Sequence, residues 1–274
     1  MNQSDRVALT FEQLAAEGRA GLVTFITAGD PDLGTSQQLM ERLPGAGADI
    51  IELGMPFSDP MADGPAIQAA NLRALANGIS LRKTLDMVTR FRQGNERTPV
   101  ILMGYFNPIY QYGPARFVRD AVESGVDGLI MVDLPPEEDD ELCDPARTAG
   151  LHWVRLVTPT SNEKRLKQVL RNTSGFIYYV SIAGITGTRS AATGAVGDAV
   201  EALRQHTRLP IAVGFGINNA DQVRQTGEIA DGAVVGSAII REIERNLDSS
   251  GTAKPQLLER VSELVSDLAQ GLRS

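Results

Sequence analysis

The chain has 274 residues, of which 42% are hydrophobic, and a formal net charge of −8 with a pI near 4.9. This length suits one barrel of alternating strands and helices, and the apolar content is ample for its core. The acidic balance argues against nucleic acid and anionic membranes as partners, because both favour basic patches. A small phosphorylated ligand is still compatible with it, since backbone amides can hold a phosphate.

A single cysteine, Cys143, excludes an intrachain disulfide. The first residues carry acids and lack the apolar core of a signal peptide. No apolar run approaches the ~18–20 residues that a membrane span needs. We therefore expect a cytoplasmic location.

Eight short apolar runs follow one another along the chain, and each leads into a helical pattern. They are rich in Val, Ile and Leu without strict polar alternation, which is typical of parallel strands buried on both faces. Eight such units without a linker predict one domain over residues 1–274, a closed (β/α)8 TIM barrel, with an open doubly wound sheet as the alternative. The expected strands are 21–29, 48–56, 99–106, 126–135, 151–159, 175–184, 209–217 and 231–240. The expected helices are 35–47, 64–78, 80–93, 113–125, 137–150, 161–175, 195–207, 218–230 and 241–247.

Two helical segments lie outside this repeat. The segment "ALTFEQLAAEGR" (8–19) precedes the first strand and is expected to close the bottom of the barrel. The segment 254–273 ends the chain, and its apolar residues recur at helical spacing, which predicts packing against the barrel wall. These residues are Leu257, Leu258, Val261, Leu264, Val265 and Leu268.

Glu52 is the first candidate site residue, because the active site of such a barrel lies at the C-terminal ends of its strands. If Ile51 and Leu53 face the helices, strand alternation turns Glu52 into the barrel mouth. A carboxylate there loses its hydration, so its pKa should rise toward a value useful for proton transfer. A structural ion pair with a neighbouring strand is the alternative.

Two aspartates follow expected strands in the same way. Asp63 lies in "MADGP", eleven residues after Glu52, and is either a second carboxylate of the site or only a turn former. Asp133 ends "LIMVD" and either faces the substrate or caps the next helix.

Three glycine-bearing loops predict a phosphate site, which TIM barrels often form after strands seven and eight. Gly216 in "GFGINN" and Gly236 in "VVGSAII" would let backbone amides approach an anion. Ser237 adds a hydroxyl at a helix start, and the strand-six loop adds Gly187. That loop, 183–194, is either a lid that excludes water or simply a long flexible loop.

The remaining residue types narrow the chemistry. No histidine or lysine falls at an expected strand end, so neither a zinc site nor a Schiff base is expected. Acid–base chemistry by carboxylates on a phosphorylated substrate remains. The residues concerned are His152, His206, Lys83, Lys164, Lys167 and Lys254.

The segment "IELGMPFSDPMADGPAIQ" closely resembles the signature of the tryptophan synthase alpha chain family. The stretches "TFITAGDP", "ILMGYFNPIYQYG", "VDLPPEE", "SIAGITGTR" and "VGFGI" also match in order and spacing. The resemblance therefore runs from about Thr24 to Ser237. It implies cleavage of indole-3-glycerol phosphate to indole and glyceraldehyde 3-phosphate in L-tryptophan biosynthesis, a retro-aldol reaction without a metal or a Schiff base.

The resemblance also implies roles for single residues. Glu52 matches the catalytic glutamate that moves a proton to indole C3 and handles the glycerol hydroxyl. Asp63 matches the catalytic aspartate at the indole N–H. The other matched positions are Tyr178, Phe25, Tyr105 and Phe215 around the indole ring, Gly187, Gly216, Gly236 and Ser237 at the phosphate, and Asp59 and Asn107 facing the beta chain.

The family works with a separate beta chain, so the resemblance implies an alpha2-beta2 heterotetramer with pyridoxal phosphate in the beta chain and no cofactor in this one. Ile182 stands where some members carry arginine, which leaves lid closure and signalling to the partner open. A free-standing lyase and a mainly regulatory subunit are the alternatives. A sibling barrel such as indoleglycerol phosphate synthase is disfavoured, because its chemistry calls for a lysine in the barrel.

Overall fold

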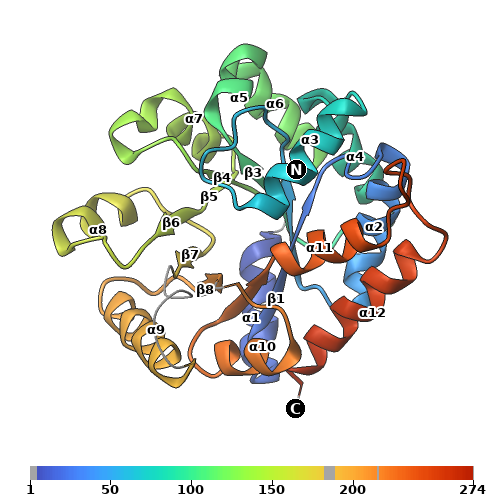
Figure 1. Ribbon diagram of the computed structural model, residues 1–274. Helices are drawn as coiled ribbons and strands as arrows, with labels where there is room; N and C mark the ends of the chain where they lie inside the picture. Colours follow the sequence, from blue (N-terminus) through green and yellow to red (C-terminus); the bar gives the residue numbers. More distant parts are fainter. Residues whose placement is uncertain (1–4, 182–188, 215, 274) are drawn as a thin grey trace.

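The structure is a computed structural model that describes residues 5–181, 189–214 and 216–273. Its strands surround the middle of the molecule and its helices lie around them (Figure 1). All strands belong to one parallel sheet, which confirms the predicted TIM barrel. The strands are β1 Gly21–Thr27, β2 Ile50–Gly54, β3 Val100–Gly104, β4 Gly128–Met131, β5 His152–Trp153, β6 Arg155–Val157, β7 Ile177–Val180, β8 Ile211–Gly214 and β9 Gly232–Val235.

The order of the strands in the sheet is β5-β4-β3-β2-β1-β9-β8-β7-β6. Its two ends, β5 and β6, are separated in the chain by Val154 alone. β5 pairs with β4 and β6 pairs with β7, so this one stretch of chain joins both ends of the sheet. The barrel is therefore nearly closed, and the expected strand 151–159 appears as two short pieces.

The helices alternate with the strands as predicted, and several begin at side-chain caps. Asp5, Asp32 and Asn162 each accept a hydrogen bond of 2.9 Å from the backbone N–H three residues further on. The helices are α1 Arg6–Glu17, α2 Leu33–Ala46, α3 Pro65–Ala76, α4 Leu81–Gly94, α5 Phe106–Tyr112, α6 Pro114–Ser124, η1 Pro136–Glu141, α7 Cys143–Thr148, α8 Glu163–Leu170, α9 Arg189–Arg204, α10 Ala220–Gly227, α11 Ser237–Arg245 and α12 Leu257–Gln270. Within the described ranges, no helix is long and apolar enough to cross a membrane.

Helix α1 closes the N-terminal end of the barrel, as its sequence predicted. Its buried residues Val7, Phe11 and Leu14 join one cluster with the apolar side chains of the barrel interior. The rings of Phe11 and Phe176 lie 5.8 Å apart between centroids. In Figure 1, α1 accordingly lies inside the ring of outer helices.

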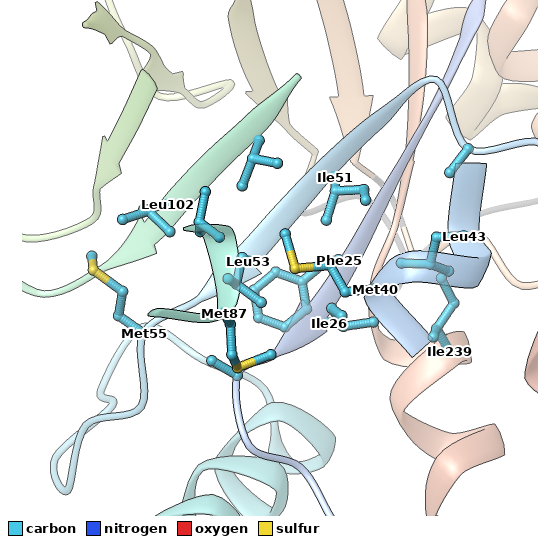
Figure 2. Packing of buried hydrophobic residues seen from close by; sticks show 14 of the residues in the cluster. Phe25, Ile26, Met40, Leu43, Ile51, Leu53, Met55, Met87, Leu102 and Ile239 are labelled. Atoms are coloured by element: carbon cyan, nitrogen blue, oxygen red, sulfur yellow. The ribbon is translucent and has the colours of Figure 1, made fainter. Parts of the chain in front are cut away.

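A second apolar layer lies between the strands and the surrounding helices, and Figure 2 shows its packing. Strand residues such as Ile51 and Leu53 meet Met40 and Leu43 of α2 and Met87 of α4 in this layer. Helix α12 packs against α2, α10 and α11, and its buried side chains belong to this same apolar cluster. The predicted apolar stripe of α12 is the side that it buries.

The structure departs from the predicted elements after the third and fourth strands. Residues 106–112 form the short helix α5, which was not predicted because seven residues are too few to show a helical period. Asp133 accepts a 2.8 Å hydrogen bond from the backbone N–H of Phe106 and so caps α5. Of the two alternatives for Asp133, a cap of the helix that follows it is therefore wrong. The expected helix 137–150 is divided into η1 and α7.

Candidate active site

Glu52 lies on β2 with its side chain in the barrel interior. Ile51 and Leu53 belong to the layer between strands and helices, and Ile50 belongs to the interior cluster. Alternation along the strand therefore turns Glu52 inward, as the sequence predicted. The residue is 1% exposed, and its Oε1 has no hydrogen-bond partner among the described residues.

Burial raises the pKa of Glu52 to about 8. An ion pair with a neighbouring strand, the alternative suggested by the sequence, would instead lower this pKa. At neutral pH the carboxyl is therefore largely protonated and can donate a proton. Because its pKa lies near neutrality, the same group can also take a proton back.

Tyr178 and Phe25 border the space around Glu52. Phe25 on β1 is the direct strand partner of Glu52 in the parallel register. Tyr178 stands on β7, and the pKa of its hydroxyl is raised by burial first and by the charge of Glu52 second. The side chains of Phe25 and Tyr178 therefore face the same part of the barrel interior as Glu52.

Glycines make room for both of these aromatic rings. A Cβ on Gly54 would lie 2.6 Å from Cζ of Phe25. A Cβ on Gly214 would lie 2.7 Å from Cε1 of Tyr178. Such separations are not tolerated between carbon atoms, so each ring keeps its position only while its neighbour is glycine.

Asp63 lies just before α3, at the end of the loop that follows β2. Its Oδ2 accepts a 3.2 Å hydrogen bond from Nδ2 of Asn71, and Tyr105 forms a second hydrogen bond with its side chain. Burial raises the pKa of Asp63, while these two hydrogen bonds lower it. The carboxylate is thus engaged by other elements and is not only a turn former.

Tyr105, predicted only as a wall of the indole pocket, also anchors the loop that bears Asp63. Its hydroxyl accepts a 2.9 Å hydrogen bond from the backbone N–H of Ala62. Its ring lies 5.2 Å from that of Phe57 between centroids. The pKa of its hydroxyl rises to about 12, through burial first and the charge of Asp63 second, so the phenol stays protonated.

Three of the predicted phosphate residues, Gly216, Gly236 and Ser237, follow the C-terminal ends of β8 and β9. Gly216 has φ +60°, a conformation that glycine adopts without strain, and its missing side chain leaves open space. Gly236 is the N-cap of α11 and provides no side-chain cap. Ser237 is the first residue of that helix, whose amide groups and dipole favour an anion.

Three residues discussed for the site lie outside the described ranges. They are Phe215, expected at the indole pocket, Gly187, expected at the phosphate, and Ile182, at the position where some relatives carry arginine. The expected partner-facing residues are described. Asp59 lies exposed on the loop after β2, and Asn107 lies exposed on α5.

Comparison with known proteins identifies the family. Residues 11–271 match the family model of the tryptophan synthase alpha chain. Tryptophan synthase subunit alpha from Legionella pneumophila str. Paris has 40% identity and a TM-score of 0.90, with 98% of each chain covered. The alpha chain from Legionella pneumophila subsp. pneumophila has 39% identity and a TM-score of 0.88, with 98% of this chain and 97% of that one covered. Tryptophan synthase from M. tuberculosis, in an open form, has 31% identity and a TM-score of 0.86, with 98% of each chain covered.

The chain belongs to the tryptophan synthase alpha chain family. The known reaction of this family is the alpha reaction, which cleaves indole-3-glycerol phosphate to indole and glyceraldehyde 3-phosphate. The chain is accordingly a carbon–carbon lyase of tryptophan biosynthesis.

In this alpha chain, sequence reasoning missed the residues of α3 that lie behind Asp63. Asn71 is 4% exposed, and Arg73 forms an ion pair with Asp30, which follows β1. A signal was present, because Asn71 shares the apolar stripe of α3 with Ala70 and Ala74. A polar residue within such a stripe needs a buried partner.

A hollow of about 640 Å³ lies at the other end of this alpha chain, between α1, α9 and α10. Its charged side chains are mostly paired, as Arg204 is with Asp231 at 3.0 Å and Arg19 with Asp49 at 2.9 Å. It lies at the N-terminal ends of the strands, away from Glu52. Among the described residues, no three His, Cys, Asp or Glu side chains gather to hold a metal ion.

The pKa of Glu52 has a consequence for stability. Because the folded state binds this proton more tightly than the unfolded state, Glu52 destabilises the fold as pH rises from about 4.5 to about 8. Between pH 5 and pH 9 the wild type should therefore lose about 4 kcal/mol more unfolding free energy than Glu52→Gln does.

Urea unfolding at both pH values measures this difference. Glu259→Gln, exposed on α12, is the matched control and should follow the wild type. Parallel pH dependence of Glu52→Gln and wild type would refute the raised pKa.

Proposed function

We propose that Glu52 and Asp63 are the two acid–base groups with which this chain cleaves indole-3-glycerol phosphate. The observation that carries the proposal is the buried carboxyl of Glu52, with a pKa of about 8 and an Oε1 without a partner among the described residues. Asp63 has a different environment, with hydrogen bonds from Asn71 and Tyr105. Two carboxyl groups in different environments can hold different protonation states at one pH.

In the proposed reaction, protonated Glu52 transfers its proton to C3 of the indole ring. The ring nitrogen then carries positive charge, and the carboxylate of Asp63 stabilises it by accepting a hydrogen bond from the N–H. Glu52, now ionised, accepts the proton of the glycerol hydroxyl next to C3. The bond between C3 and the glycerol carbon breaks, its electron pair returns to the ring, and indole and glyceraldehyde 3-phosphate are formed.

The aromatic residues around Glu52 suit the indole ring. Phe25 and Tyr178 border the interior beside the carboxyl, and Tyr105 stands beside Asp63. Phe215 completes this set in the proposal. Aromatic side chains offer the apolar faces on which a planar ring packs favourably.

The phosphate of the substrate is assigned to the ends of β8 and β9 and to the loop after β7. Gly216, Gly236 and Ser237 offer backbone amides, a hydroxyl and the N-terminus of α11. Gly187 is the fourth residue of this proposed group. An uncapped helix N-terminus holds an anion without basic side chains, which agrees with the net charge of −8.

Glu52→Gln tests the proposed proton transfer. The two side chains have nearly the same shape, so folding and substrate binding should persist while kcat falls by about 10²–10⁴-fold. Steady-state indole release measures kcat, and calorimetry with the substrate measures binding. Glu12→Gln, exposed on α1, is the control and should keep the wild-type rate. A Glu52→Gln enzyme that retains most of its kcat would rule out the role of Glu52.

Gly216→Asp tests the phosphate site. A carboxylate beside the phosphate repels it, so KM should rise about tenfold or more while kcat changes less. Gly251→Asp is the matched control, because Gly251 also has a positive φ, +80°, and open space around its Cα. An unchanged KM in Gly216→Asp, or an equal rise in Gly251→Asp, would count against this site.

We further propose that the chain acts with a pyridoxal-phosphate-dependent beta chain in an alpha2-beta2 heterotetramer in the cytoplasm. Asp59 and Asn107 are the expected contact residues. Next to them lie two large apolar side chains that are unusually exposed, Met61 at 83% and Tyr110 at 59%. Contacts of Tyr105 with Phe57 and Ala62 join the loop after β2 to the start of α5. The loop residues Asp59 and Met61 and the α5 residues Asn107 and Tyr110 therefore lie on the same side of the barrel.

The partner is tested by measuring indole release by this chain with increasing amounts of a beta chain. We expect the beta chain to raise the rate, and Tyr110→Ser to weaken this activation without changing the rate of the isolated chain. Leu9→Ser is the matched control, since Leu9 is 53% exposed but lies on α1 at the other end of the barrel. Full activity without any response to the beta chain would indicate a free-standing lyase. Activation of the beta chain without indole release would indicate a regulatory subunit.

A further inference from the structure

We propose that Asn71 is a positioning residue that fixes the orientation and the charge of the Asp63 carboxylate, and that the ion pair of Asp30 with Arg73 holds α3 where Asn71 can do so. The inference rests on the proposed role of Asp63. It extends that role to residues that do not touch the substrate.

The side chain of Asn71, on the buried side of α3, contacts the carboxylate of Asp63. Its Nδ2 donates a 3.2 Å hydrogen bond to Oδ2 of Asp63, and the residue is 4% exposed. Ala70 and Ala74 flank it on the buried side of the helix. Because the side chain is almost fully buried and hydrogen-bonded, its amide has few alternative positions, so it can hold the carboxylate in one orientation.

The backbone of Asp63 is fixed by two further hydrogen bonds that do not involve its carboxylate. Nε2 of Gln68 donates a 2.8 Å hydrogen bond to the carbonyl oxygen of Asp63. The backbone N–H of Asp63 donates a 3.0 Å hydrogen bond to the carbonyl oxygen of Pro60. Because the backbone is held independently of Asn71, a change at Asn71 acts chiefly on the carboxylate.

The ion pair of Asp30 with Arg73 ties α3 to the barrel. Nε of Arg73 lies 2.6 Å from Oδ1 of Asp30, and a terminal nitrogen of Arg73 lies 3.0 Å from Oδ2. The carboxylate of Asp30 is fully buried, and Asp30 follows β1, which carries Phe25. Two parallel hydrogen bonds fix direction as well as distance, so this pair sets how α3 lies against β1.

The charged and titratable groups around Asp63 make its ionisation depend on Asn71. Tyr105, from the end of β3, stays protonated, and Arg73, further along α3, is neutralised by Asp30. Asp59 on the same loop and Glu52 on β2 are acidic, so neither supplies a positive charge that would stabilise the ionised form of Asp63. Burial favours the protonated form of Asp63, and the hydrogen bonds of the Asn71 amide and the Tyr105 hydroxyl oppose it.

Three substitutions at position 71 test this role through the pH dependence of kcat/KM for indole release. Asn71→Leu removes the donor, so the acid limb assigned to Asp63 should move up by about one pH unit. Asn71→Asp places a second carboxylate beside the first and should move the limb further. Asn71→Gln keeps a donor and should restore a limb near that of the wild type. The alkaline limb, assigned to Glu52, should stay at about pH 8 in all three.

The matched control is Asn172→Leu. Asn172 also donates from a partly buried amide to a carboxylate, at 2.7 Å to Oδ2 of Asp139, but next to α8. It should lower stability without moving either limb. An unmoved acid limb in both Asn71→Leu and Asn71→Asp would overturn the positioning role. If Asn71→Leu does not fold, Asn71→Ala removes the same donor without adding a branched side chain.

Asp63→Asn separates this inference from the proposed function. If Asp63→Asn keeps most of its activity, the proposed role of Asp63 fails. If Asp63→Asn is inactive and the limb does not move in the Asn71 variants, only the positioning role fails.

Arg73→Gln tests the ion pair of Arg73 with Asp30. In this variant kcat should fall about tenfold with little change in KM, and Arg73→Lys should recover part of the lost kcat. A loss of stability with unchanged kcat in Arg73→Gln would overturn the part assigned to the ion pair.

Discussion

Closure of a parallel sheet around its own side chains is the constraint on which this molecule depends. Strands β1, β2, β4, β8 and β9 are buried on both faces, and α1 closes the N-terminal end with Val7, Phe11 and Leu14. Water is thereby kept from the barrel interior, and a carboxyl group that points into it loses its hydration. The raised pKa of Glu52 follows from this closure and needs no charged neighbour.

The carboxyl groups at the two ends of the barrel differ in their hydrogen-bond partners. At the N-terminal end, Asp49, Asp127 and Asp231 each accept a hydrogen bond from the first backbone N–H groups of a neighbouring strand. Each of them is also paired with arginine. Toward the C-terminal end, Oε1 of Glu52 and Oγ1 of Thr27 lie buried without a partner among the described residues. Unpaired buried polar groups cost stability, and the active sites of such barrels lie at this end.

Glu52 on β2 and Asp63 at the end of the loop that follows it have carboxyl groups in different electrostatic environments. Glu52 is held by a strand, and its Oε1 receives no hydrogen bond from the described residues, so the neutral form of the carboxyl is favoured. Asp63 is held by a loop and receives hydrogen bonds from two other elements, so its charged form is better supported. The loop can serve both residues because Tyr105, Gln68 and Asn71 fix its far end from the outside.

Much of this arrangement could be predicted from the sequence. Period and composition were enough for the strands, for α1 as a plug, for the buried stripe of α12 and for the inward direction of Glu52, because each depends on the local alternation of apolar residues. The resemblance to the family favoured a catalytic role for Asp63 over that of a turn former, and it added the residues expected around the indole. Helix α5 was not predicted, since it is short and its N-terminus is capped by Asp133 from the loop after β4.

Tertiary structure alone decided which partners the carboxylates have. No pattern in the chain pairs Asp30 with Arg73, 43 positions away, or places Tyr105 beside Ala62. The pKa of Glu52 likewise depends on how many atoms exclude water around it. Local sequence determines on which side of a strand or helix a residue lies, whereas hydration and pairing depend on segments that only the closed barrel brings together.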